Sequence, residues 1–78
     1  MADKLYGAQI GIVANTMDPA GSARVKVRFP WLPGGDSPWA RVCRPFGAPA
    51  AAPQVGASVV VLFEGGDPDR PIVLGRVD

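Results

Sequence analysis

The chain has 78 residues, and residues 1–78 are expected to form one domain with a thin core. Eight basic and seven acidic residues give a net charge of +1, which excludes a general electrostatic basis for binding nucleic acid or an anionic membrane. The apolar fraction of 47% is high for so small a domain and indicates apolar surface reserved for other chains.

Glycine and proline spacing indicates an all-β chain. Ten glycines and nine prolines leave no window long enough for a helix. The first strand is expected over residues 5–14, and a turn-rich segment follows at 15–22. In that turn Asp18 supplies a side-chain acceptor, Pro19 a fixed φ and Gly21 a positive φ. Alternation divides the first strand into two faces, one with Ala8, Ile10, Ile12 and Ala14 and the other with Gln9, Gly11 and Val13.

The second strand, residues 23–29, has the clearest alternation. Pro30 ends this strand, a glycine- and proline-rich loop follows at 33–38, and a short third strand is expected over 39–43. The side chains predicted to face inward are Ala23, Val25, Val27 and Phe29, and those predicted to face outward are Arg24, Lys26 and Arg28.

The fourth strand, residues 57–63, contains an unbroken apolar run from Val59 to Phe63. Both faces of this strand therefore need cover, either from closure of a barrel or from another subunit. Residues 44–54 are expected to form an irregular loop, and Pro68 suits the second position of a turn within 64–70. A fifth strand is expected over 71–77.

Five short strands with a long third connection predict a closed, five-stranded Greek-key barrel of the oligosaccharide/oligonucleotide-binding (OB) type. An SH3-like barrel is the nearest competitor, because strand count alone does not determine topology.

Residues for catalysis and metal binding are scarce. Histidine is absent, and Cys43 has no cysteine or histidine partner for a zinc site, so we interpret it as a buried, inert thiol. Asp67 and Asp69 lack the further oxygen ligands of an EF-hand and are interpreted as turn-capping residues. Glu64 lies in the same solvated loop, so we do not interpret Glu64 and Asp67 as a catalytic acid/base pair. We expect no enzyme activity, no metal and no cofactor.

The sequence also predicts where the chain is made. No apolar run is long enough to cross a bilayer, and no hydrophobic signal core follows Met1. A single cysteine cannot form an internal disulfide, which fits a reducing compartment. We expect cytoplasmic synthesis and no membrane insertion by this chain.

Arg24, Lys26 and Arg28 provide the best argument for a nucleic-acid module, because three cations on one strand face can follow a phosphate backbone. The basic face of this strand carries no aromatic platform of its own, although Tyr6, Trp31 and Trp39 could supply one from elsewhere in the chain. We favour a solvated or ion-paired face over nucleic-acid contact. Trp31 and Trp39 flank the glycine-proline loop and either cap the barrel ends or anchor an interface. An oligosaccharide-binding module that uses the tryptophans is a weaker alternative.

Taken together, these segments resemble the phage baseplate spike OB domain, which is shared by contractile phage tail spikes, type VI secretion spike proteins and related injection systems. The resemblance covers the chain from Tyr6 to Gly75, and its four motifs occur in the same order as in the family. Its four motifs are Asp18–Gly21 with Arg24–Trp31, Trp39–Val42, Pro53–Gly56 with Val59–Pro71, and Val73–Gly75.

The resemblance implies a homotrimeric collar that joins the baseplate hub and tail tube to a spike. It implies an outward-facing Val60 and Leu62 that bury against a neighbouring subunit, with Trp31 and Trp39 as further candidates. It also implies that Gly56 starts a strand and that a tight hairpin is shaped by Gly65, Gly66 and Pro68.

The sequence departs from the family in two ways. The family's domain is usually followed by a β-helical spike or a lysozyme-type domain, whereas this sequence stops at Asp78. A separate spike or tip protein is therefore expected as a partner. The loop at 44–53 is also richer in alanine than the family's loop, so its contacts are expected to differ.

Overall fold

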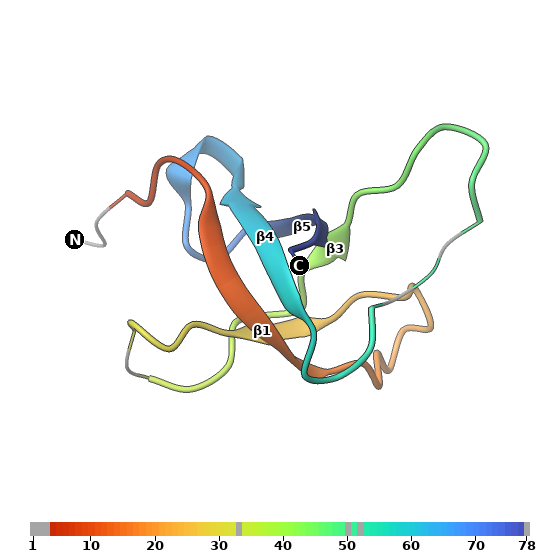
Figure 1. Cartoon of the computed structure of the whole chain (residues 1–78), viewed down its shortest axis with the longest axis horizontal. Coiled ribbons are helices and arrows are strands. Elements are labelled where there is room, and N and C mark those ends of the chain that lie inside the picture. Colours follow the sequence, from red (N-terminus) through yellow and green to blue (C-terminus); the bar gives the residue numbers. More distant parts are fainter. Residues whose placement is uncertain (1–3, 33, 50, 52, 78) are drawn as a thin grey trace.

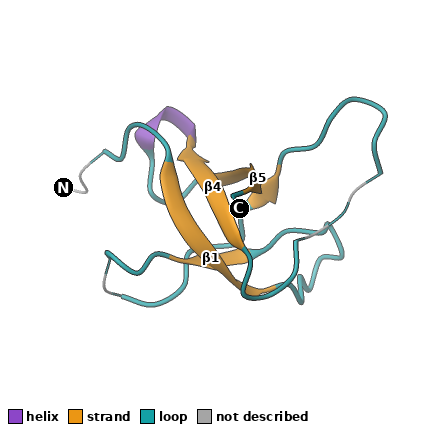
Figure 2. Cartoon of the chain, in the orientation of Figure 1, coloured by secondary structure: helices purple, strands orange, loops and turns teal. Residues whose placement is uncertain are grey.

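Five strands and one short 3-10 helix form the regular structure of the chain (Figures 1 and 2). The computed structural model describes residues 4–32, 34–49, 51 and 53–77. No α-helix occurs among these residues, so the all-β prediction is confirmed, and all five predicted strands are present near their expected positions. The elements are β1 (Gln9–Asn15), β2 (Lys26–Arg28), β3 (Arg41–Val42), β4 (Ser58–Phe63), the 3-10 helix η1 (Glu64–Gly66) and β5 (Pro71–Arg76).

The strands form one sheet in the order β2-β1-β4-β5-β3. β1 pairs antiparallel with β2 and with β4, and β4 pairs antiparallel with β5. β3 instead pairs parallel with β5, which separates this topology from a simple up-and-down meander. In Figure 1, β1 and β4 run side by side across the centre of the molecule. The order and the mixed pairing agree with an OB-type fold.

The prediction of a closed barrel is wrong, because the sheet curls into an open half-barrel. At the seam between β2 and β3, pairing is limited to an isolated bridge between Val25 and Ala40, with N···O distances of 3.0 and 2.7 Å. The edge of β2 is instead occupied by Ser37. The Val27 N–H donates to the Ser37 hydroxyl at 2.9 Å, and the Ser37 N–H donates to the Val27 carbonyl at 2.8 Å. A loop residue thus satisfies the backbone groups that a longer third strand would have paired.

The inward positions of the strands supply the core. The interior side of β1 is the face of Gly11 and Val13, which leaves Ile10 and Ile12 outside. On the second strand Val25, Val27 and Phe29 are buried as predicted, whereas Ala23 is half-buried. The buried core consists of Val13, Val25, Val27, Phe29, Ala40, Val59, Val61, Phe63 and Val73.

Gly11 is required by close packing between β1 and β2. A Cβ at this position would lie 2.3 Å from Val27 Cγ1 and 3.0 Å from Phe29 Cε1. These distances are too short for a methyl group, so glycine lets the two strands approach. The absence of a side chain at Gly11 therefore leaves room for the side chains of Val27 and Phe29.

The β4–β5 connection combines η1 with a turn. Gly65 and Gly66 have φ of 62° and 78°, in the region that favours glycine. The Arg70 N–H donates to the Asp67 carbonyl at 2.9 Å, which puts Pro68 at the second position of a four-residue turn. The Asp67 carboxylate accepts from the Asp69 N–H at 2.9 Å, which confirms a turn-capping role for Asp67.

Candidate functional site

β4 carries apolar side chains on both of its faces. Val59, Val61 and Phe63 are buried, whereas Val60 is half-buried and Leu62 is 37% exposed. Alternation along the strand therefore directs Val60 and Leu62 away from the core. Val60 and Leu62 therefore keep more solvent exposure than Val59, Val61 and Phe63, and no other described part of the chain buries them.

The strands on both sides of β4 continue this outward apolar surface. Ile10 of β1 is opposite Val60, and Ile72 of β5 is opposite Leu62. Ile10 is 48% exposed. A bulge between Val60 and Val61 shifts the register with β5 and leaves Leu74 exposed beside this surface. We call it the outer apolar face, and its residues are Ile10, Ile12, Val60, Leu62, Ile72 and Leu74.

Basic residues lie at both margins of the outer apolar face. Arg28 of β2 is opposite Ile12, and Arg41 of β3 is opposite Ile72. Arg28 Nε lies 3.5 Å from Asp36 Oδ1, and Arg41 is paired with Glu64. An apolar centre with a charged rim is typical of surfaces at which protein chains associate.

The two tryptophans lie away from the outer apolar face. Trp31 follows β2 and packs on Phe29, with a ring-centroid distance of 5.3 Å. Trp39 precedes β3 at the seam, which is two strands from β4 in either direction along the sheet. The four predicted interface residues are therefore placed in separate regions, and only Val60 and Leu62 share one surface.

The basic stripe of the second strand is engaged within the chain. Arg24 binds Asp18, Arg28 binds Asp36, and the Lys26 ammonium lies 5.2 Å from the centroid of Trp39. The Arg24 guanidinium also lies 5.9 Å from that ring. Of the three aromatic residues that the sequence offered to this stripe from elsewhere in the chain, Trp39 is the one placed against it, through the seam between β2 and β3.

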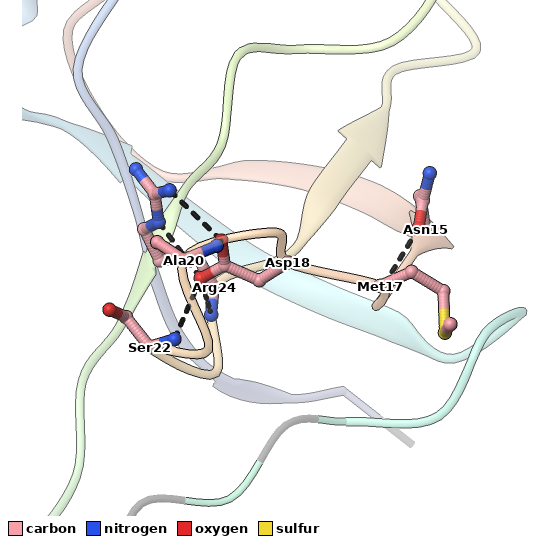
Figure 3. A network of polar contacts seen from close by, with 6 residues as sticks. All are labelled: Asn15, Met17, Asp18, Ala20, Ser22 and Arg24. Atoms are coloured by element: carbon pink, nitrogen blue, oxygen red, sulfur yellow. Dashed lines mark hydrogen bonds and ion pairs between the residues drawn. The ribbon is translucent and has the colours of Figure 1, made fainter.

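The Asp18 carboxylate organises the β1–β2 connection (Figure 3). It accepts hydrogen bonds from Arg24 Nε at 3.0 Å and Nη2 at 2.9 Å, and its side chain is only 2% exposed. It also accepts from the backbone N–H groups of Ala20, Ser22 and Arg24. The hydrogen bonds from Arg24 hold the pKa of Asp18 well below its usual range. Gly21 has φ of 67°, as its predicted place in the turn requires.

Cys43 is exposed, so the prediction of a buried thiol is wrong. Its backbone N–H donates to the Val73 carbonyl at 2.7 Å, but β3 ends at Val42 and the side chain of Cys43 is left at the surface. Among the residues that the structure describes, no group of three or more acidic, cysteine or histidine side chains is placed to hold a metal ion. Within the same residues, no helix has the length and apolar character needed to cross a membrane.

Gly56 has φ of 91° and lies two residues before Ser58, the first residue of β4. Its N–H donates to the Val13 carbonyl at 2.8 Å, and the Val13 N–H donates to the Ala57 carbonyl at 2.9 Å. Gly56 therefore lies where the chain turns to place β4 beside β1. The residues that sequence reasoning missed at the outer apolar face are Ile10, Ile12, Ile72 and Leu74. Alternation had already put Ile10 and Ile12 on one side of their strand.

Comparison with known proteins identifies similar domains. Residues 9–77 match the family model described as the type VI secretion system/phage-baseplate injector OB domain. This match includes all five strands and the outer apolar face.

Individual relatives include type VI secretion system spike proteins and one toxin. The type VI secretion system spike protein VgrG3 of Vibrio cholerae is 36% identical over 81 residues, which cover 83% of this chain and 8% of the relative. The actin cross-linking toxin VgrG1 of Vibrio cholerae is 35% identical over 81 residues, with 83% of this chain and 7% of the relative covered. The spike protein VgrG1a of Pseudomonas aeruginosa is 40% identical over 63 residues, with 69% of this chain and 10% of the relative covered. The chain thus spans a tenth or less of the length of these relatives.

Proposed function

This chain belongs to the family of type VI secretion system and phage-baseplate injector OB domains, and we propose that it acts as a trimeric collar between the hub and the spike of a contractile injection machine. In this proposal the chain is made in the cytoplasm and then assembled into the baseplate. Its proposed role is mechanical: the small, curled sheet transmits load between the tail tube and the tip.

The outer apolar face is the observation that carries this proposal. β4 is central in the sheet, yet its outward residues Val60 and Leu62 continue into Ile10 and Ile72 on the adjacent strands. Leaving so much aliphatic surface in water is unfavourable by about 25 cal/mol per Å². Contact with sister copies would remove this surface from water and complete a core that a chain of this length keeps thin.

A non-enzymatic role is part of the proposal. The relatives include spike proteins, whose names describe structural components, and one toxin named for actin cross-linking. The toxin's matched segment is 7% of its length, so its named activity belongs to the whole relative. For this chain we propose that hub, tube and tip proteins are the partners, and that the chain contributes no reaction of its own.

The proposal is tested by measuring mass in solution. Multi-angle light scattering of the purified chain is expected to give about three times the 8.1 kDa of one chain. The variant Leu62→Asp puts a charge on the outer apolar face and is expected to reduce the mass to that of a single chain.

Val55→Asp is the matched control, because Val55 is 62% exposed and lies outside the face. This variant is expected to leave the mass unchanged. A wild-type chain that stays monomeric at high concentration, also in the presence of its hub protein, would contradict the collar.

A further inference from the structure

We propose that the basic hollow beside the seam binds an acidic segment of a partner polypeptide. The hollow has a volume of about 560 Å³ and lies between the β1–β2 connection and β3. Its lining residues are Ala20, Ser22, Arg24, Arg41, Val42 and Arg44. Three of these are arginines, and none of the described residues that line it is acidic.

The three arginines differ in how much of their charge is available. Arg24 is held by Asp18 (Figure 3), and its side chain is 32% exposed. Arg41 is paired with Glu64 at one end and is 64% exposed. Arg44 is exposed and forms no ion pair with any residue that the structure describes. The hollow is therefore lined by one cation that has no ion pair among the described residues, beside two that are held in place.

The hollow lies on the surface of strands two and three with the adjacent connections, where OB-type folds bind oligonucleotides and oligosaccharides. A second, adjoining hollow shares Arg24 and Arg41 and extends past Trp39 to Arg70 in the β4–β5 connection. The two hollows adjoin along the seam, and the second one also contains Glu64 and Asp69. The seam is two strands away from Val60 and Leu62, and only Arg41, which is opposite Ile72, also borders the outer apolar face.

The occupant is assigned by charge and by the state of Trp39. Arginine guanidinium groups bind carboxylates through paired hydrogen bonds, which suits aspartate and glutamate side chains. A single-stranded nucleic acid needs open aromatic faces on which bases stack, whereas Lys26 and Arg24 already lie against Trp39. Glu64 and Asp69 line the adjoining hollow and would repel regularly spaced phosphates. An acidic polypeptide can place its carboxylates to avoid these two groups.

The test uses a short fluorescein-labelled peptide of alternating glutamate and glycine, with fluorescence anisotropy as the readout. The wild-type chain is expected to bind the peptide, and Arg44→Glu is expected to weaken binding by about tenfold, as loss of a charge-assisted contact predicts. Arg44 has no partner among the described residues, so this variant is expected to fold normally, which circular dichroism checks.

The matched control is Lys4→Glu, which changes the net charge by the same amount at an exposed position outside the hollow. It is expected to change binding by less than about twofold once ionic strength is physiological. Equal effects of the two variants, or no binding by the wild-type chain, would overturn the proposal. Tighter binding of a single-stranded thymidine oligonucleotide of equal charge would overturn it as well. Because mass and peptide binding are separate measurements, a failure here leaves the trimeric collar standing.

Discussion

Asp18 and Arg24 form a two-point ion pair, with N···O distances of 2.9 and 3.0 Å, across a connection that also ties three backbone N–H groups to the same carboxylate. The pair stabilises the loop that connects β1 to β2. It also keeps Arg24 beside Trp39 at the seam.

The Asp18 carboxylate is expected to make stability depend on acid pH. Its pKa in the folded chain is lowered, chiefly by the hydrogen bonds from Arg24, whereas an unfolded aspartate titrates near about 4. A depressed folded pKa contributes stability above the unfolded pKa, and this stability is lost as the pH falls through the folded value. Urea unfolding between neutral and strongly acidic pH is expected to show this loss.

In Asp18→Asn the acid-dependent loss is expected to be smaller, and the neutral-pH stability lower, than in the wild type. Asp69→Asn is the control, because Asp69 is exposed in the β4–β5 turn. An identical pH profile for Asp18→Asn and the wild type would show that the ion pair does not contribute.

Gly11→Ala is expected to destabilise the fold, because the added methyl group meets Val27 Cγ1 at 2.3 Å. Overpacking of this kind costs about 1–3 kcal/mol. Chemical denaturation measures this cost. Gly75→Ala on β5 is the matched control, since a Cβ there meets nothing within 4 Å, and it is expected to be close to neutral. Equal stabilities of the two variants would contradict the close approach of β2 to β1.

Val60 and Val61 are adjacent on β4, and the same substitution is expected to act on them differently. Val61 is fully buried, so Val61→Thr leaves a hydroxyl in the core and is expected to cost about 1–3 kcal/mol at every protein concentration. Val60→Thr is expected to change the stability of a single chain little.

The effect of Val60→Thr should appear in the concentration dependence of the urea midpoint, because association stabilises the folded chain by mass action. The wild-type midpoint is expected to rise with protein concentration, and Val60→Thr is expected to reduce that rise. A larger loss of single-chain stability in Val60→Thr than in Val61→Thr would contradict the assignment of the two faces.

Cys43 is expected to react with a thiol reagent without unfolding, because its side chain is exposed. A chromogenic disulfide reagent should titrate the thiol in native buffer on the same timescale as in denaturant. Reaction only after addition of denaturant would show that the thiol is protected in the native state. No loss of stability is expected on labelling, since the side chain takes no part in the core.

Local sequence pattern determined the strands and the turns of this protein. Alternation on the second strand correctly predicted that Val25, Val27 and Phe29 are buried, because a half-buried strand has a period of two. Asp18, Gly21 and Pro68 act in their turns as their side-chain chemistry and allowed φ values predict. These features depend on a few consecutive residues and need no knowledge of the rest of the chain.

Tertiary structure alone decided which side of β1 faces the core, since both sides carry apolar residues and only the contact of Val27 and Phe29 with Gly11 distinguishes them. Tertiary structure also decided that the barrel is open at the seam and that Cys43 is exposed. It placed Arg24, Arg41 and Arg44 around one hollow. Each of these outcomes depends on contacts between segments far apart in the sequence, whose packing no local pattern encodes.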